Sequence, residues 1–417
     1  MKKTMLLYAV SLSVLSTAYA KKESNLQQMI TFLQDYIHIN TAQPNPNYKP
    51  AIEFLTRHAQ DHGFESRVIK LSENRDAVII TLRGSDPTLP ALALNHHMDT
   101  VPLITSAAQT FDPLGATLED DHIYGIGTQD MKGVGVVQYW ALLKLKQTIG
   151  TPRRTIHLIG VPDEEIGGFS GAGKLVETQE FKDLNIKYLL DESIPSGDEK
   201  SICINVAERK VLHIELESVG KMGHASDFSI PNAVNNLIQF LSQLVSIHNE
   251  QKQHIPHTMP GKLLSQNVTS INCSKKANEG INVIPDRATA TVDIRIPATR
   301  TVKSVQNFVD ELIEKYHGIS YTIKACISDD IISQSDTHSK FFKTIKSVVS
   351  SLGYNPIEHH AQGASDMRFY LTNGIESFGL SPFTIKANLH GANECIRICD
   401  LELGLEVYYE ILKKMCT

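Results

Sequence analysis

The sequence is poor in cysteine, in basic tracts and in long apolar runs. Six cysteines in 417 residues are too few for a disulfide-dependent scaffold, even in an exported protein. Cys395 and Cys399 have no second cysteine or histidine pair at zinc-finger spacing, so they indicate packing or at most one bridge. The net charge of -6 and the lack of a basic tract argue against a nucleic-acid surface. After residue 20, no run is apolar and long enough for a membrane helix.

The first twenty residues have the pattern of a secretory signal peptide. Lys2 and Lys3 precede an apolar run over residues 5–15, and Ala18-Tyr19-Ala20 has the form of a cleavage site. The run is too short to span a bilayer. We therefore expect residues 1–20 to be cleaved and the protein to be exported, to a periplasm or out of the cell.

The length of the chain and a change in its hydrophobic pattern predict two domains. In the first half, short apolar runs alternate with amphipathic stretches, which predicts a sheet covered by helices. Near residue 208 the pattern changes to strands with one solvated face, in the β-α-β-β-α-β order of a ferredoxin-like domain. We predict a catalytic domain split over residues 21–207 and 329–417, with an inserted domain over residues 208–328.

Three segments place imidazoles or carboxylates where predicted strands end. They are His97-Met98-Asp99, the glycine-containing segment around Asp130, and Asp163-Glu164-Glu165. Ligands of such sheets bind at the carboxyl ends of the strands. Histidine nitrogens and carboxylate oxygens are zinc ligands in hydrolytic sites, where a further carboxylate can act as a base. Together the three segments predict a hydrolytic metal site.

Each of these segments has a different expected task. In His97-x-Asp99 the carboxylate would orient a metal-binding imidazole. Gly125-x-Gly127 lacks the third glycine of a dinucleotide loop, so we interpret it as a turn that brings Asp130 to one metal ion or between two. The acids at 163–165 form either a solvated loop or a cluster that needs a cation, and Gly167-Gly168 favours the second because it suggests a close-packed turn.

Eight blocks along the chain resemble a known family. They are LNHHMDTVP (94–102), IYGIGTQDMKG (123–133), RTIHLIGVPDEEIGG (154–168), LLDES (189–193), GKMGHAS (220–226), INVIPDRATATVDIRIP (281–297), GASDMR (363–368) and LHGANE (389–394). The chain resembles the dinuclear-zinc family of aminoacylases, acetylornithine deacetylase, succinyl-diaminopimelate desuccinylase and glutamate carboxypeptidase, with the aminoacylase-1 group most similar. The resemblance implies an α/β fold: a zinc-peptidase-like catalytic domain with helices on both faces of a mixed sheet. The insert would be an α+β lid and dimerisation domain.

The resemblance also implies a site of two zinc ions per subunit, for which cobalt or manganese could substitute. His97 and Glu192 would bind one ion and Glu165 and His390 the other. Asp130 would bridge the two ions.

The remaining roles follow from the same blocks. Asp99 would orient His97, and Glu164 would be the general base. His224 would reach the active site of the other subunit in a homodimer and stabilise the oxyanion. The substrate's carboxylate would be held by three matching residues, Asn282, Arg295 and Arg368.

From this resemblance we expect an exported zinc-dependent amidohydrolase that cleaves N-acyl-L-amino acids with a metal-activated water. A dipeptidase or carboxypeptidase acting on short peptides would share every metal residue. A binding protein that kept the fold and lost catalysis is a third alternative, and the presence of all ligands and of Glu164 disfavours it.

Overall fold

The computed structural model describes residues 23–103, 106–257, 259–274 and 280–417, so the predicted signal peptide lies outside the described residues. The chain forms two compact units. Unit 1 comprises the described residues up to Ile204 together with Asp336–Ile357 and Asn373–Thr417, and unit 2 comprises Asn205–Ser335 and Glu358–Thr372.

Residues 358–372, predicted as part of the catalytic domain, belong to unit 2. They are fastened to its first residues by hydrogen bonds. Arg209 Nε donates to the Gln362 carbonyl over 2.8 Å, and the Glu208 carboxylate accepts from the Ser365 N–H over 3.0 Å. These long-range bonds leave no local signal in the sequence.

Unit 1 is built on a mixed eight-stranded sheet, although the last three residues of β8 and of β15 belong to unit 2. Its strand order is β1-β2-β6-β3-β7-β16-β8-β15. The bounds are β1 Glu65–Ser72, β2 Arg75–Leu82, β6 Ile156–Val161, β3 Ala91–His97, β7 Ile186–Asp191, β16 Glu376–Leu380, β8 Ser201–Ala207 and β15 Asn355–His360. β3 is parallel to β6 and β7, and β7 is parallel to β16, whereas β1, β2 and β6 pair antiparallel. The predicted mixed sheet is confirmed.

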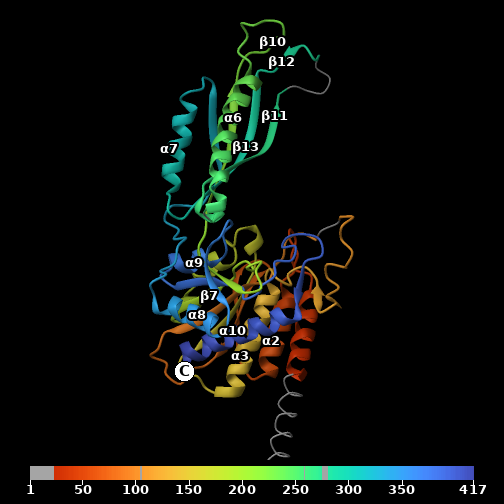
Figure 1. Ribbon diagram of the computed structural model, residues 1–417, viewed down its shortest axis with the longest axis vertical. Coiled ribbons are helices and arrows are strands. Elements are labelled where there is room, and N and C mark those ends of the chain that lie inside the picture. The colour runs from red at the N-terminus through yellow and green to blue at the C-terminus, as the bar shows by residue number, and fades with distance from the viewer. Residues whose placement is uncertain (1–22, 104–105, 258, 275–279) are drawn as a thin grey trace, which may run out of the picture. The chain divides into compact units, whose positions relative to one another are not determined.

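Helices bury the sheet of unit 1. Every residue of β3 and β6 is buried, as expected for strands covered on both faces. α3 contacts β3, β6 and α10, and α2 contacts β1 and β2 (Figure 1). The helices of unit 1 are one over residues 23–38, α2 Lys49–Asp61, α3 Lys132–Ile149, η1 Glu164–Ile166, α4 Ala172–Leu175, α5 Gln179–Lys182, α8 Lys340–Ser351 and α10 Ile398–Cys416. A small sheet, β17-β5-β4, joins Cys395–Arg397, His122–Tyr124 and Thr117–Glu119.

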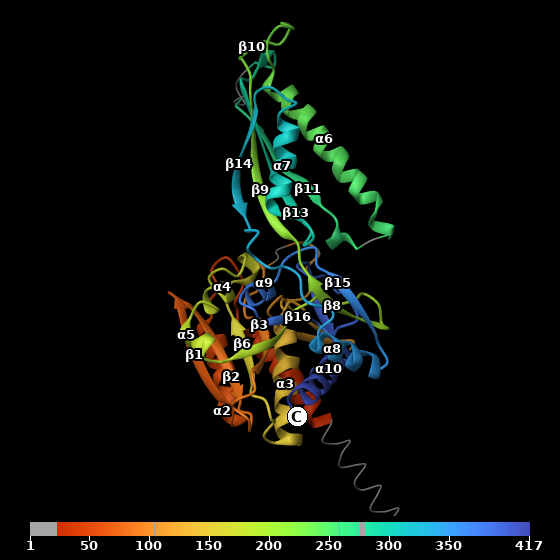
Figure 2. The same ribbon diagram turned by 90° about the vertical axis from the view of Figure 1, so that its left-hand side faces the viewer.

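Unit 2 contains the predicted ferredoxin-like arrangement. Its antiparallel sheet has the order β11-β13-β9-β14, with β11 Ser265–Cys273, β13 Arg287–Ile296, β9 Lys210–Val219 and β14 Ile319–Cys326. α6 (Ala233–Gln253) and α7 (Val302–Ile313) run alongside these strands (Figure 2). Alternate residues of β13 are buried in one apolar core with residues of both helices. This burial explains why apolar residues recur at every second position of its sequence.

Short elements complete unit 2. A separate two-stranded sheet pairs β10 (Gly223–His224) with β12 (Val283–Ile284). The others are η2 Ile255–His257, η3 Pro260–Lys262 and α9 Met367–Thr372. Within the described part of the chain, none of the helices has the length and apolar character needed to cross a membrane.

Candidate dinuclear metal site

Five side chains with metal-ligand chemistry meet in unit 1. They form two groups in which one candidate ligand atom per residue lies within 4.8 Å of the others. The groups are His97, Asp130 and Glu192, and Asp130, Glu165 and His390. These are the five residues that the sequence analysis named as ligands, and Asp130 belongs to both groups.

The parallel strands explain why three of these residues converge. His97 is the last residue of β3, Glu165 follows β6 in η1, and Glu192 follows β7. β6 and β7 are the two parallel neighbours of β3, so their carboxyl ends share one edge of the sheet. Asp130 comes from the loop before α3, and His390 from a loop near the C-terminus.

Asp130 presents one carboxylate oxygen to each imidazole. Its Oδ1 lies 3.0 Å from His97 Nε2, and its Oδ2 lies 2.9 Å from His390 Nε2. Glu192 Oε2 is 3.8 Å from His97 Nε2, and Glu165 Oε2 is 3.3 Å from His390 Nε2. Each imidazole thus has its own glutamate and a share of Asp130, which is the arrangement that a carboxylate bridge between two ions requires.

The electrostatics of the cluster favour bound cations. Burial raises the pKa of Glu165 and of Glu192, and the charge of Asp130 raises both further. Burial also opposes ionisation of Asp130, but hydrogen bonds with His390 and His97 hold its pKa well below the usual range. Glu165 Oε1 is buried and has no hydrogen-bond partner among the described residues. The two imidazoles and three carboxylates, one of which has this orphaned oxygen, are ligand types that zinc binds in proteins.

Asp99 ties two of the metal-site segments together. Its Oδ1 accepts the N–H of Glu164 and its Oδ2 the N–H of Glu165, both over 3.2 Å, while Gln43 Nε2 donates to Oδ2 over 2.8 Å. His97 Nδ1 lies 3.5 Å from Asp99 Oδ1 but 3.0 Å from the Asp99 carbonyl oxygen. The imidazole is therefore oriented mainly by the backbone of Asp99, and the carboxylate mainly positions η1.

The three consecutive acids have three different environments. Asp163 is buried, has a left-handed backbone (φ 65°), accepts from Tyr48 over 2.7 Å and pairs with Arg75. Glu164 is half-buried, whereas the side chain of Glu165 is only 5% exposed and faces His390. The turn at Asp163 thus anchors the segment, and its neighbours are the groups available for chemistry.

Glu394 supports the site and was not named in the sequence analysis. It is buried and accepts the N–H groups of Gln129 over 2.8 Å and Asp130 over 3.3 Å. Burial raises the Glu394 pKa to about 8, with a further contribution from the Asp130 charge, against the effect of these backbone hydrogen bonds. Glu394 thus fixes the loop that carries Asp130. The feature of the sequence that could have identified Glu394 is its position four residues after His390.

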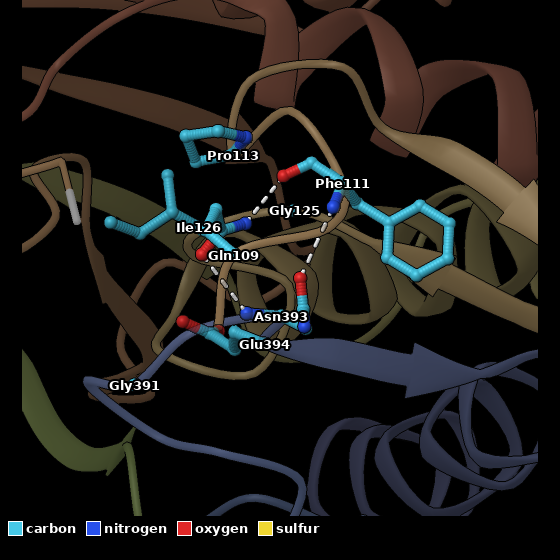
Figure 3. A pocket seen from close by; sticks show the side chains of 8 residues that line it. All are labelled: Gln109, Phe111, Pro113, Gly125, Ile126, Gly391, Asn393 and Glu394. Atoms are coloured by element: carbon cyan, nitrogen blue, oxygen red, sulfur yellow. Dashed lines mark hydrogen bonds between the residues drawn. The ribbon is translucent and has the colours of Figure 1, made fainter. Parts of the chain in front are cut away.

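A small cavity borders the segment that follows His390, and its lining includes Gly391, Asn393 and Glu394 (Figure 3). Its volume of about 10 Å³ is close to that of one water molecule. Asn393 joins its walls: its N–H donates to Gln109 Oε1 over 3.1 Å, and its Oδ1 accepts from the Phe111 N–H over 3.2 Å. These bonds hold a loop in which His390 has a left-handed backbone, with φ 56°.

His224 and Asn282 lie together in unit 2, in what we call the tip (residues 223–226 and 282–284). Both are exposed, and the Asn282 amide lies 3.1 Å from His224 Nε2. The Nδ1 atom of His224 accepts from the Ser226 N–H over 3.2 Å and lies 2.7 Å from Ser226 Oγ. Both ring nitrogens thus have a hydrogen-bonding neighbour, Ser226 at Nδ1 and Asn282 at Nε2, and these contacts orient the ring.

The two arginines named for substrate binding are both engaged within unit 2. Arg295 Nε and Nη2 donate to the two oxygens of Asp293 over 2.8 and 3.0 Å. Arg368 is buried in α9, donates to the Ser365 carbonyl and lies 4.6 Å from the centre of the Phe369 ring. Arg295 keeps one edge of its guanidinium for a ligand, whereas Arg368 is part of the packing.

Comparison with known proteins gives the following matches. Residues 93–414 match the family described as Peptidase family M20/M25/M40. Aminoacylase-1 of Dictyostelium discoideum is 29% identical over 403 residues, which cover 93% of this chain and 97% of that protein. Two solved structures share the fold. An M20 family metallo-carboxypeptidase from Sulfolobus solfataricus has a TM-score of 0.71 at 16% identity, covering 93% and 98% of the chains. Human carnosine dipeptidase 1 has a TM-score of 0.68 at 13% identity, covering 96% and 99%.

Proposed function

Since the chain belongs to Peptidase family M20/M25/M40 and is a metal-dependent hydrolase, we propose that it cleaves the amide bond of N-acyl-L-amino acids. The observation that carries the proposal is the sharing of Asp130 between two clusters of ligand atoms. The aminoacylase-1 relative, which aligns over nearly the whole chain, supports this substrate class over others in the family.

Asp130 and the four ligands around it would hold two zinc ions, with cobalt or manganese as substitutes. Bound zinc would polarise the scissile carbonyl and acidify a water molecule. Asp99 and Glu394 would keep the ligand-bearing segments in place through backbone N–H groups. Metal binding would also neutralise the repulsion among three closely spaced carboxylates.

Glu164 would be the general base. It is half-buried and directly precedes the ligand Glu165, and its N–H is fixed by Asp99. A carboxylate in this position would accept the proton of the attacking water and deliver a proton to the leaving amine. In this hydrolysis the C–N bond breaks, the hydroxyl of water goes to the acyl carbon, and its proton goes to the amine.

His224 would complete the site from the second subunit of a homodimer. Its exposure supports this role, and an imidazole N–H is a donor of the kind that an oxyanion needs. Asn282, beside it, and the free edge of Arg295 would hold the substrate's carboxylate. The burial of Arg368 gives its direct contact with substrate less support.

Export remains part of the proposal through the sequence of residues 1–20. A periplasmic or extracellular enzyme of this kind would scavenge N-acyl amino acids, and would have no role in cytoplasmic amino-acid synthesis. Identification of residue 21 as the N-terminus of the mature protein in its native host would test this.

The substrate class is tested with a paired panel. Zinc-loaded protein is assayed on N-acetyl amino acids and on dipeptides with the same C-terminal residue, and kcat/KM is compared pair by pair. We expect the N-acetyl compounds to be preferred. A consistent preference for dipeptides would replace the proposal by a dipeptidase. No turnover of either class by protein that holds its metal would indicate a binding protein.

A further inference from the structure

Unit 2 contains a cavity that the proposed function does not use. Its volume is about 210 Å³. It lies among the C-terminal end of α6, the segment around η3, and the start of β11. Its lining includes Arg209, His248, Lys252, Ile255, Leu263 and Leu264.

A buried arginine forms one wall of the cavity. Arg209 is only 8% exposed. Its Nε donates to the Gln362 carbonyl over 2.8 Å, and its Nη1 donates to Ser265 Oγ over 2.8 Å. Among the described residues Nη2 has no hydrogen-bond partner, and no carboxylate lies within 4 Å of the guanidinium. Asp293, an acid whose charge acts on Arg209, pairs with Arg295.

The cavity carries positive charge without a counter-charge. Lys252 and His248 lie four residues apart on α6 and so share one face of that helix. No aspartate or glutamate is among the described lining residues. His248 Nδ1 is buried and has no hydrogen-bond partner in the described part of the chain. The two full charges of Arg209 and Lys252 outweigh the partial negative charge, about half an electron, at the end of α6.

The remaining wall is apolar and limits the ligand's size. Ile255, Leu263 and Leu264 line it together with Pro260. The volume of about 210 Å³ is below the roughly 300–1,000 Å³ of sites for drug-sized ligands. A fitting ligand is therefore a small anion with a short apolar group. Arginine and lysine both bind carboxylate and phosphate, but the apolar wall favours an organic chain over an inorganic ion.

We propose that this cavity binds a short-chain organic carboxylate, with the carboxylate between Arg209 Nη2 and Lys252 and the chain against Leu263 and Leu264. This site lies wholly within unit 2 and does not rest on the proposed function.

The test uses the full-length, metal-loaded protein and the inert probe 4,4,4-trifluorobutanoate. Its Kd is measured from the ¹⁹F line width, and its location from the ring signal of His248, assigned by the loss of that signal in His248→Gln. We expect Lys252→Met to weaken binding about tenfold, equivalent to about 1.4 kcal/mol. Lys303→Met, an exposed lysine on α7 outside the cavity, is the matched control and should bind as the unaltered protein does.

Arg209→Lys keeps the positive charge but loses the planar set of N–H donors of the guanidinium, so it should also weaken binding. Circular dichroism checks that this variant is folded. Lys252 is exposed, so its variant keeps the test decisive if Arg209→Lys fails to fold. An unmoved His248 signal, or equal Kd values for Lys252→Met and Lys303→Met, would overturn the site. Inorganic phosphate binding as tightly as the probe would overturn the organic ligand class.

Discussion

The five-ligand cluster of unit 1 and the tip of unit 2 are held in place in opposite ways. The ligands come from segments as distant as His97 and His390, and buried groups such as Asp99 and Glu394 lock their backbones. The tip is exposed, and His224, in a pair of two-residue strands, is oriented by Ser226 and Asn282, which lie just outside those strands. Buried hydrogen bonds are costly to leave unmade, so the cluster is fixed before any ligand arrives.

The contrast indicates how the chemistry is divided. The cluster has the rigidity that a metal site needs, together with a deficit of positive charge that metal ions would supply. The tip holds an exposed imidazole that is oriented by Ser226 and Asn282. We interpret it as a group that becomes useful only against a second surface.

Glu164→Gln should nearly abolish turnover and leave the metal cluster intact. Loss of a general base lowers rates by about 10²–10⁴-fold, and an amide cannot accept the proton. The measurement is kcat together with metal content by mass spectrometry. Near-normal kcat would remove Glu164 from the base role, and loss of metal would place it among the ligands instead.

His224→Ala should lower kcat by about 10²–10³-fold, as expected for one oxyanion donor, with unchanged metal content. Mixing this variant with Glu164→Gln should then restore part of the activity, because each mixed dimer has one site with both groups intact. The subunit exchange is verified with differently tagged chains. Verified exchange without recovery would contradict the donation of His224 across subunits.

Ser226→Ala should have the smallest effect. It removes the hydroxyl 2.7 Å from His224 Nδ1 and keeps the backbone N–H that also donates there. A hydrogen bond of about 0.5–1.5 kcal/mol corresponds to a loss of roughly two- to tenfold in kcat. The exposed Ser229, which bonds to Asp227, offers a matched control in Ser229→Ala. Equal kcat in both variants would show that the orientation of His224 does not depend on Ser226.

The regular elements were predictable because their patterns are periodic and local. The apolar run over residues 155–161 forms β6 (Ile156–Val161), and the stretch of helical spacing over residues 134–147 lies in α3 (Lys132–Ile149). Apolar and polar residues alternate over residues 287–296, which form β13, because one face of that strand is buried and the other is not. Parallel strands then implied that residues after their ends would meet.

Other parts of the site left no such pattern. His390 lies in a loop with a left-handed backbone, and only the family resemblance gave it a role. Glu394, Gln43 and Tyr48 act through hydrogen bonds to residues more than a hundred positions away or to backbone groups, which composition and spacing do not encode. The burial of Arg368 likewise depends on the packing of residues 358–372 into unit 2.

The metal content of three proteins shows whether Asp130 is shared by two ions. Unaltered protein, Asp130→Ala and His224→Ala are loaded with zinc, freed of excess metal and analysed by mass spectrometry. We predict two zinc ions per chain in the unaltered protein and in His224→Ala, and fewer than one in Asp130→Ala, because both clusters share that carboxylate. One ion or none in the unaltered protein, or two in Asp130→Ala, would contradict the shared dinuclear site.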